Sequence, residues 1–289
     1  MASARVRRAA VLGSPVSHSL SPVLHRAAYT ELALTDWSYD AIECDESQLA
    51  DLIADSGPEV VGYSCTMPLK REVLRVASAV SEEAAAIGAG NTLLRIDDDW
   101  YADNTDWIGI RDAVADRGLA ITGNIAVLGA GGTAQAALAA LAGAETVTVW
   151  ARDPMRTLDL LETAERLDVA VTIARLDDEA IGALVAADLV ISTAPAGAVD
   201  RLALLPWRAE QALLDVVYHP WPTVLARAVT AAGGTVISGA EMLLFQAVRQ
   251  VELMTGRAAP VQAMRAALAA VVPDGGLRPR ETTAPAESA

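Results

Sequence analysis

A single lysine, Lys70, is the residue of this chain whose type most directly suggests proton chemistry. The sequence holds 22 Lys and Arg residues together, and every one except Lys70 is Arg. Arg stays protonated near neutral pH, whereas Lys can exchange its proton when its surroundings favour the neutral amine. A bias toward Arg explains a low Lys count, but it does not explain why this position kept its Lys. Taken alone, Lys70 is equally well explained by chance and by a catalytic acid.

Four polar clusters accompany Lys70 along the first part of the chain. They comprise residues 17–22, 66–70, 91–92 and 103–106. Hydroxyls at a helix start suit a carboxylate or a phosphate, although Ser21 is also explained as a cap of the helix that Pro22 opens. Each cluster alone is explained by turn chemistry, and together they favour a site.

A glycine-rich turn in the middle of the chain is the candidate for cofactor binding. Its residues are Gly129, Ala130, Gly131, Gly132, Thr133 and Ala134, between a predicted strand and a predicted helix. Such a turn lets backbone N–H groups approach a pyrophosphate at the helix N-terminus. The spacing departs from a strict G-x-G-x-x-G, and glycine turns also occur where a strand and a helix pack closely.

The end of the next predicted strand bears on the choice of cofactor. Arg152 and Arg156 would face the 2′-phosphate of NADP, whereas Asp153 would accept from the 2′-hydroxyl of NAD. A solvated strand end accounts for Asp153 equally well. We therefore expect NADP, with NAD as the alternative.

Strands that alternate with helices predict an α/β fold of two domains with mainly parallel sheets. In the first unit we expect strands at 8–13, 37–44, 60–67, 92–96 and 100–102, and a helix at 70–79. From residue 124 a βαβαβ series of Rossmann type begins, with helices 239–253 and 260–271 returning to the first unit. We predict a substrate-binding catalytic domain of residues 1–106 and 239–272, a dinucleotide-binding domain of residues 107–238, and a disordered tail of residues 273–289.

Composition narrows the class of function. The formal charge of −15 disfavours binding to nucleic acid or to an anionic membrane surface. Two Cys and three His do not make a disulfide framework or a metal site, and His25 is expected at the surface or in a turn. The uncharged stretch 119–144 is interrupted by glycine and polar residues, so it is not read as a membrane span. We expect a cytoplasmic protein with a small-molecule substrate, as a monomer or a homodimer.

At this point the chain resembles the shikimate dehydrogenase family. The matching segments are Gly13-Ser14-Pro15, His18-Ser19-Leu20-Ser21-Pro22, Thr66-Met67-Pro68-Leu69-Lys70, Gly90-Asn91-Thr92-Leu93, Asp103-Asn104-Thr105-Asp106, Gly129-Ala130-Gly131-Gly132, Asp215-Val216-Val217-Tyr218 and Gly239-Ala240-Glu241-Met242-Leu243 with Gln246. They follow the family's order over nearly the whole chain. The combination is specific, although no single motif is.

The resemblance implies NADPH-dependent, reversible reduction of 3-dehydroshikimate to shikimate, in the chorismate route to aromatic amino acids. It implies Lys70 and Asp106 as the catalytic pair. It implies that substrate is bound by Ser19, Ser21, Thr66, Asn91, Asp106, Tyr218 and Gln246. It places the cofactor against residues 129–134, with Arg152, Arg156 and Gly239, and it involves no metal.

Some positions depart from the family's pattern. Ser64 and Cys65 stand where Asn-Val is frequent, and Trp107 stands where Gly is usual, so Trp107 is expected to narrow the site. Ala151 and Asp153 replace an Asn and a Thr that help to bind NADP. Two alternatives therefore remain: a quinate/shikimate dehydrogenase that uses NAD, and a non-catalytic module that senses NADP(H). The retained Lys70 disfavours the second.

Overall fold

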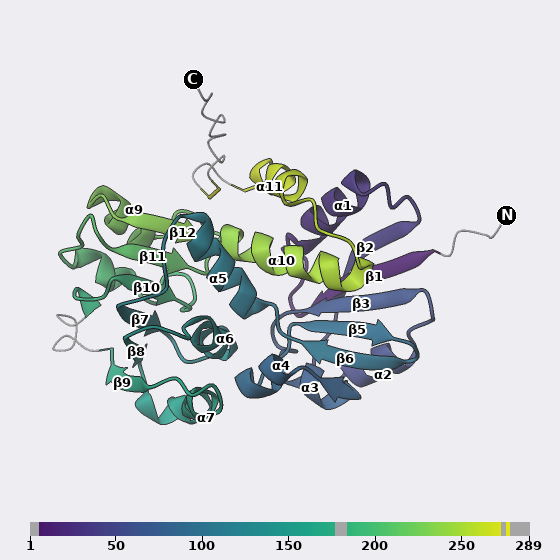
Figure 1. The fold of residues 1–289 in the computed structure, drawn as a ribbon, viewed down its shortest axis with the longest axis horizontal. Coiled ribbons are helices and arrows are strands. Elements are labelled where there is room, and N and C mark those ends of the chain that lie inside the picture. The colour runs from purple at the N-terminus through teal and green to yellow at the C-terminus, as the bar shows by residue number, and fades with distance from the viewer. Residues whose placement is uncertain (1–5, 177–183, 273–275, 278–289) are drawn as a thin grey trace, which may run out of the picture.

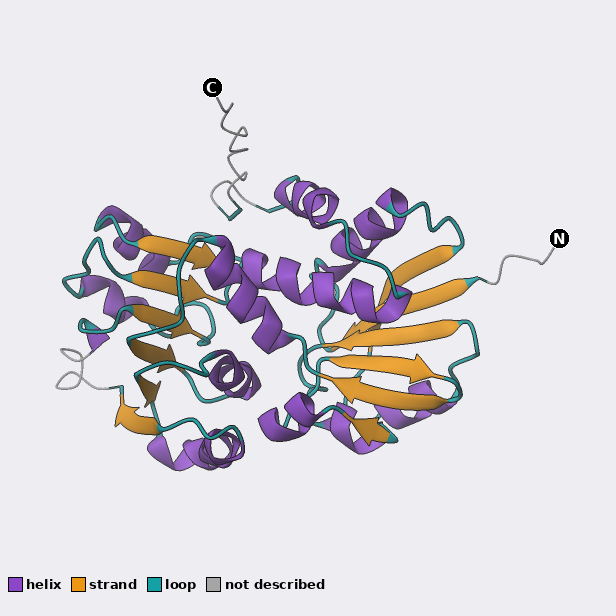
Figure 2. Ribbon diagram, in the orientation of Figure 1, coloured by secondary structure: helices purple, strands orange, loops and turns teal. Residues whose placement is uncertain are grey.

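The computed structural model describes residues 6–176, 184–272 and 276–277. It contains two six-stranded sheets, each packed against helices, and two long helices lie between the sheets (Figures 1 and 2). The α/β class predicted from the alternation of strands and helices is confirmed.

The first sheet has the strand order β2-β1-β3-β5-β6-β4. Its strands are β1 (Arg7–Gly13), β2 (Trp37–Glu43), β3 (Val60–Cys65), β4 (Ala79–Val80), β5 (Thr92–Ile96) and β6 (Asp99–Asp103). Its helices are α1 (Ser21–Glu31), α2 (Leu49–Ala54), α3 (Glu72–Val76) and α4 (Glu82–Ile87). β2, β1 and β3 are parallel, whereas β5 is antiparallel to both β3 and β6. The predicted hairpin of residues 92–96 and 100–102 is therefore present.

The second sheet is parallel throughout, with the order β12-β11-β10-β7-β8-β9. Its strands are β7 (Asn124–Leu128), β8 (Thr146–Ala151), β9 (Val171–Arg175), β10 (Leu189–Ser192), β11 (Ala212–Asp215) and β12 (Thr235–Ser238). Its helices are α6 (Gly132–Ala140), α7 (Leu158–Arg166) and α9 (Val224–Ala231), with the short 3₁₀ helices η1 (Pro154–Thr157) and η2 (Asp200–Leu204). This is the Rossmann order, whose ligand crevice opens where the order reverses, between β7 and β10.

Three further helices connect the two halves: α5 (Asp106–Asp116), α10 (Gly239–Thr255) and α11 (Val261–Ala269). α10 packs along α5 and reaches α1, between the sheets (Figure 1). One face of α10 buries Ala240, Leu244, Ala247, Val251 and Met254 in a core shared with α1 and β1. That spacing of three and four residues is the apolar stripe of a packed helix. The predicted return of the C-terminal helices to the first unit is confirmed.

Three expectations need correction or a limit. The helix expected at 70–79 is shortened to α3 because the Lys70 carbonyl accepts a hydrogen bond from the N–H of Gly90 at 2.7 Å, outside any helical pattern. Within the tail expected to be disordered, Leu277 is 9% exposed and packs in the same core as α10, and Gly276 accepts a hydrogen bond from Ser238. The rest of that tail lies outside the described residues, as do residues 177–183 of the predicted Rossmann-type series.

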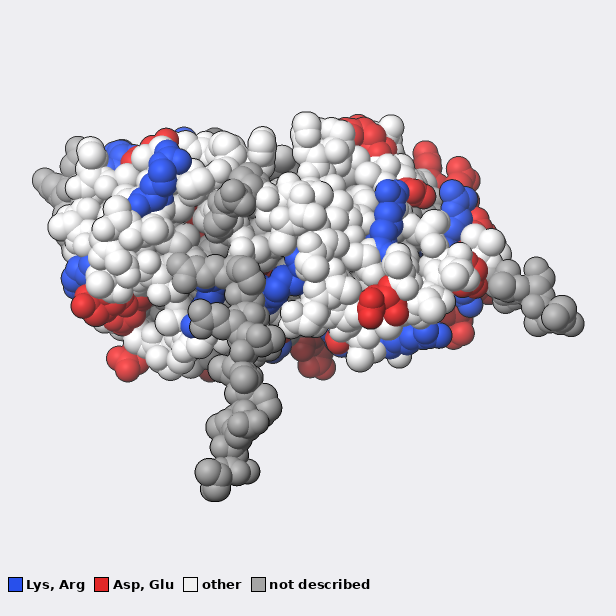
Figure 3. All heavy atoms as spheres, turned by 90° about the horizontal axis from the view of Figure 1, so that it is seen from above, with Lys and Arg blue, Asp and Glu red and all other residues white. Residues whose placement is uncertain are grey.

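The surface shows both signs of charge. On the face drawn in Figure 3, acidic and basic side chains are scattered among uncharged residues. That face lacks the continuous basic area that binding to a phosphate backbone requires. Across the described part of the chain, no helix combines the length and the apolar character needed to cross a membrane.

Candidate active site

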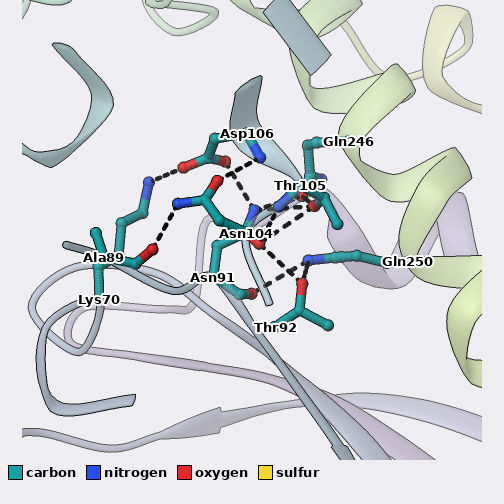
Figure 4. A network of polar contacts seen from close by, with 9 residues as sticks. All are labelled: Lys70, Ala89, Asn91, Thr92, Asn104, Thr105, Asp106, Gln246 and Gln250. Carbon is teal, nitrogen blue, oxygen red and sulfur yellow. Dashed lines mark hydrogen bonds and ion pairs between the residues drawn. The ribbon is translucent and has the colours of Figure 1, made fainter. Parts of the chain in front are cut away.

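Lys70 and Asp106 form an ion pair at one edge of the first sheet. Lys70 Nζ lies 2.5 Å from Asp106 Oδ2, with the side chains 21% and 8% exposed. The other carboxylate oxygen, Oδ1, accepts a hydrogen bond from Asn91 Nδ2 at 2.8 Å (Figure 4). Charge-assisted hydrogen bonds of this kind are strong and directional, so the ammonium is held in one place.

Strand register explains why three distant segments meet here. Ser64 at the carboxyl end of β3 pairs with Thr92 at the start of β5, and Thr92 pairs with Asp103 at the end of β6. The segments that follow β3 and β6 and the one that precedes β5 therefore lie at the same edge. They are 66–70, 104–106 and 90–91, which supply Lys70, Asp106 and Asn91.

The orientation of the Asn91 amide is determined by its neighbours. Its Oδ1 accepts from the backbone N–H of Thr105 and from the hydroxyl of Thr92, each at 2.8 Å. A backbone N–H can only donate, so the amide oxygen must face Thr105 and the NH₂ group must face Asp106. Gln250 Nε2 in turn donates to Thr92 Oγ1 at 2.9 Å, which ties the network to α10 (Figure 4).

A cavity of about 280 Å³ opens onto the Lys70–Asp106 pair. It is lined by every residue that the sequence analysis placed against the substrate: Ser19, Ser21, Thr66, Asn91, Asp106, Tyr218 and Gln246. Thr133 and Gly239, expected on the cofactor, line this same cavity. Burial raises the pKa of Tyr218, so its hydroxyl keeps its proton and can donate.

The sequence analysis did not anticipate Gln250 as a lining residue. Gln250 lies one helical turn beyond Gln246 on α10, and a spacing of four residues puts both amides on one face. That spacing was the available signal. Gln250 is fully buried and accepts a hydrogen bond from Ser64 Oγ at 2.6 Å.

A second cavity, of about 760 Å³, lies at the carboxyl ends of the second sheet's strands. Gly129, Ala130, Gly131 and Arg152, which were expected at the cofactor, line it together with Thr193, which follows β10. The two cavities approach each other at α6, because a Cβ atom built on Gly132 would lie 3.9 Å from Lys70 Cδ. The pair therefore stands between a small cavity with many polar lining residues and a larger one.

The start of α6 fits a dinucleotide. Gly131 caps α6 without any side-chain hydrogen bond, which leaves the first N–H groups of the helix available to a ligand. A Cβ on Gly131 would meet nothing within 4 Å, so the turn borders open space. Gly129 has φ +111°, a conformation that favours glycine. These observations fit a pyrophosphate at this turn.

Other residues expected at the cofactor differ. Ala134 is fully buried in the core of the second half, so its predicted cofactor contact is wrong. Asp153 Oδ1 accepts from the N–H of Met155 at 3.0 Å and so begins η1, and both Asp153 and Arg152 are exposed and line the cavity. The side chain of Arg156 lies outside the described part of the structure. Within the described residues, no group of three or more His, Cys, Asp or Glu could hold a metal ion.

Comparison with protein families matches two segments of the chain. Residues 11–93 match the shikimate dehydrogenase substrate binding domain, and residues 239–269 match the shikimate 5′-dehydrogenase C-terminal domain. A relative named shikimate dehydrogenase (NADP(+)) from Halorubrum lacusprofundi is 38% identical over 277 residues, which cover 90% of this chain and 97% of that protein. The chain belongs to the shikimate dehydrogenase family.

Solved structures agree with this assignment. The shikimate dehydrogenase of Mycobacterium tuberculosis is 44% identical, with a TM-score of 0.84 over 92% of this chain and 100% of that one. A shikimate 5-dehydrogenase from Thermus thermophilus, solved in complex with NADP(H) and shikimate, is 33% identical, with a TM-score of 0.77 over 91% and 99%.

The structure accounts for two departures from the family's pattern. Ser64, like Gln250, lines the small cavity. It accepts a hydrogen bond from Tyr39 at 2.6 Å. Trp107 was expected to narrow the site, but it lines neither cavity. It packs instead against the core of the second half, with Arg111 stacked over its ring at 5.0 Å. That expectation is therefore wrong.

Proposed function

We propose that this protein catalyses the reversible, NADPH-dependent reduction of 3-dehydroshikimate to shikimate. The observation that carries the proposal is the Lys70–Asp106 pair, 2.5 Å apart, placed between the polar cavity and the glycine turn. Membership of the shikimate dehydrogenase family and relatives named shikimate dehydrogenase (NADP(+)) support the reaction and the cofactor.

Lys70 acts as the proton donor to the substrate oxygen. NADPH, when bound, supplies the hydride that reduces the ring ketone. Lys70 gives a proton to the oxygen as negative charge develops on it, and it takes a proton back in the reverse direction. Asp106 holds the ammonium through their ion pair, and Asn91 holds Asp106 from the other side. A positioned acid of this kind contributes about 10²–10⁴-fold to the rate.

The polar lining of the small cavity binds the substrate. Ser19 and Ser21, at the start of α1, hold the carboxylate, with Tyr218 beside them. Thr66, Asn91 and Gln246 receive the ring hydroxyls. Since several of these groups are buried, an analogue that lacks a hydroxyl leaves one of them without a partner, and this gives specificity.

The glycine turn and Arg152 bind NADP. Backbone N–H groups at Gly131 and Gly132 would hold the pyrophosphate, and Arg152 would hold the 2′-phosphate. Asp153 lines the same cavity, but its Oδ1 is engaged in starting η1, which supports NADP over NAD.

We also propose the division into a substrate-binding domain of residues 1–106 and 239–272 and a cofactor-binding domain of residues 107–238. Each has its own sheet and a core packed mainly against that sheet, although Met242 of α10 is buried in the core of the second one. A cytoplasmic location and a monomeric or homodimeric state stay predictions of the sequence analysis.

The test is the initial rate of formation of reduced cofactor from shikimate and NADP, with quinate and NAD as comparison arms. Lys70→Ala should lower kcat by about 10²–10⁴-fold while leaving the fold intact. Arg75→Ala is the matched control, because Arg75 is an exposed cation on the neighbouring α3 that pairs with Glu72 of its own helix. It should keep the wild-type rate.

Three results would count against the proposal. A Lys70→Ala variant with a near-wild-type rate would remove the assigned acid. Faster turnover of quinate with NAD would favour the quinate/shikimate alternative. Tight binding of NADP without turnover of either acid would identify a sensing module.

A further inference from the structure

The loop between β1 and α1 is held by a side chain from the neighbouring strand, Glu43. Ser14 Oγ donates to Glu43 Oε1 at 2.6 Å, and the backbone N–H of Val16 donates to Glu43 Oε2 at 3.1 Å. Both carboxylate oxygens thus contact the same loop, two residues apart. The strand register makes this possible, because Glu43 ends β2 opposite Gly13, which ends β1.

These contacts continue to the two serines of the small cavity. The carbonyl of Val16 accepts from the N–H of Ser19 at 2.9 Å, and Ser19 Oγ accepts from the N–H of Ser21 at 3.3 Å. Val16 itself is 4% exposed and packs in the core beneath α1. A displacement of Val16 would therefore move Ser19 directly and Ser21 through it.

We propose that Glu43 is a positioning residue for the carboxylate of the substrate. It holds the loop so that the hydroxyls of Ser19 and Ser21 point into the cavity. This inference rests on the proposed function, in which these serines bind an anionic ring acid. Glu43 is not among the residues that line the cavity, so it acts through the loop and not by touching the ligand.

Because Glu43 is charged, the direction of the change in KM on its removal tests the proposal. Shikimate is an anion at neutral pH, and a carboxylate near its binding site repels it. If Glu43 acted only through its charge, its removal would lower KM for shikimate. If Glu43 acts by holding the loop, its removal raises KM for shikimate, because the hydroxyls of Ser19 and Ser21 are no longer fixed in the positions that bind the carboxylate.

Glu43→Gln keeps the size of the side chain but retains only one acceptor oxygen for two donors. We expect KM for shikimate to rise by roughly 5–20-fold, with kcat and KM for NADP within about twofold of wild type. Ser14→Ala should raise KM less. The double variant should show less than the product of the two single effects, because both remove the same contact.

Glu46→Gln is the matched control, since Glu46 is an exposed acid three residues further along the same segment. It removes the same charge and should leave KM unchanged or slightly lower. If Glu43→Gln changes KM no more than Glu46→Gln does, the proposal is overturned. The proposed function stays intact in that case, provided that the wild type turns over shikimate.

A second measurement does not depend on turnover. Hydrogen exchange at the amides of Val16 and Ser19 should be faster in Glu43→Gln than in wild type, because the Val16 N–H loses its acceptor. Equal exchange rates in the two proteins would also overturn the proposal. If the wild type showed no turnover of shikimate, the proposed function would fail, and the exchange rates would still decide whether Glu43 holds this loop.

Discussion

Cys65 shows how the surroundings of a side chain decide whether it can react. Cys65 lines the small cavity beside Thr66, where a reactive thiol would be a nucleophile. Burial, with Cys44 nearby, raises the pKa of the Cys65 thiol well above its ordinary value. The thiolate is the reactive form, so this cysteine is inert near neutral pH. The proposed chemistry at this site accordingly makes no use of Cys65.

His25 makes the stability of the protein depend on pH. The ring is fully buried and stacks on Tyr39 with 3.9 Å between centroids. Burial lowers the pKa of His25 to about 3 from 6.5, an effect that the Gln250 side chain opposes. The expectation that His25 lies at the surface or in a turn is wrong, because α1 turns this residue toward β2.

The lowered pKa predicts loss of stability in acid. Above pH 6.5 the His25 ring is neutral in both states and has no effect. Between pH 6.5 and 3 the unfolded chain binds a proton that the folded protein does not, so stability falls as the pH falls. The free energy of unfolding should fall by up to about 1.4 kcal/mol per pH unit in this window because of His25.

Urea unfolding at pH 7 and pH 5 measures this effect. His25→Phe keeps an aromatic ring against Tyr39 but cannot titrate, and it should lose about 2 kcal/mol less than wild type between the two values. Identical losses in the two proteins would show that His25 does not govern the acid response.

Two glycines at helix starts have opposite functions. Gly239 begins α10 where the chain returns to the first half, and a Cβ there would lie 2.0 Å from the carbonyl oxygen of Val216. Gly131 precedes α6 at φ −86°, and a Cβ there would meet nothing. Close packing of the backbone requires the first glycine. Nothing in the packing requires the second, and the open space beside it is available to a ligand.

This contrast gives a paired prediction. Gly239→Ala should destabilise the fold by about 1–3 kcal/mol or more, because the clash is with backbone that cannot move aside. Gly131→Ala should leave the melting temperature unchanged and weaken NADP binding by roughly tenfold or more, as its methyl enters the space of the pyrophosphate. Calorimetric melting and titration with NADP measure the two effects. A Gly131→Ala variant with wild-type affinity would place the cofactor elsewhere.

The two halves are joined by buried charges as well as by helix packing. Arg117, just after α5, donates to Glu241 on α10 through Nε at 3.0 Å and Nη2 at 2.5 Å. The Glu241 side chain is 2% exposed, and burial raises its pKa although Arg117 opposes this. Arg265 on α11 pairs with Asp116 at the end of α5 at 2.9 Å. Helices that belong to different halves thus share one polar network.

Breaking this network at one residue should be costly. Glu241→Leu leaves Arg117 buried without its main partner, and we expect a loss of about 3–5 kcal/mol in the free energy of unfolding. Replacing both residues with Leu should recover much of that loss, since an apolar pair needs no counter-charge. Denaturant unfolding of the wild type, Glu241→Leu and the double variant measures these free energies. A double variant no more stable than Glu241→Leu would show that the pair itself, and not the unpaired charge, sets the cost.

Local patterns in the amino-acid order were enough for the α/β class, the Rossmann series and the glycine turn, whereas the residues expected around the substrate came from the family resemblance. Periodicity and turn chemistry are properties of neighbouring residues, so they can be recognised without coordinates. The contact of Lys70 with Asp106 depends instead on how β3, β5 and β6 pair, and pairing between distant strands has no local signature. For the same reason the burial of His25, the core position of Ala134, the packing of Trp107 and the hold of Glu43 on the serine loop emerged only from the packed molecule.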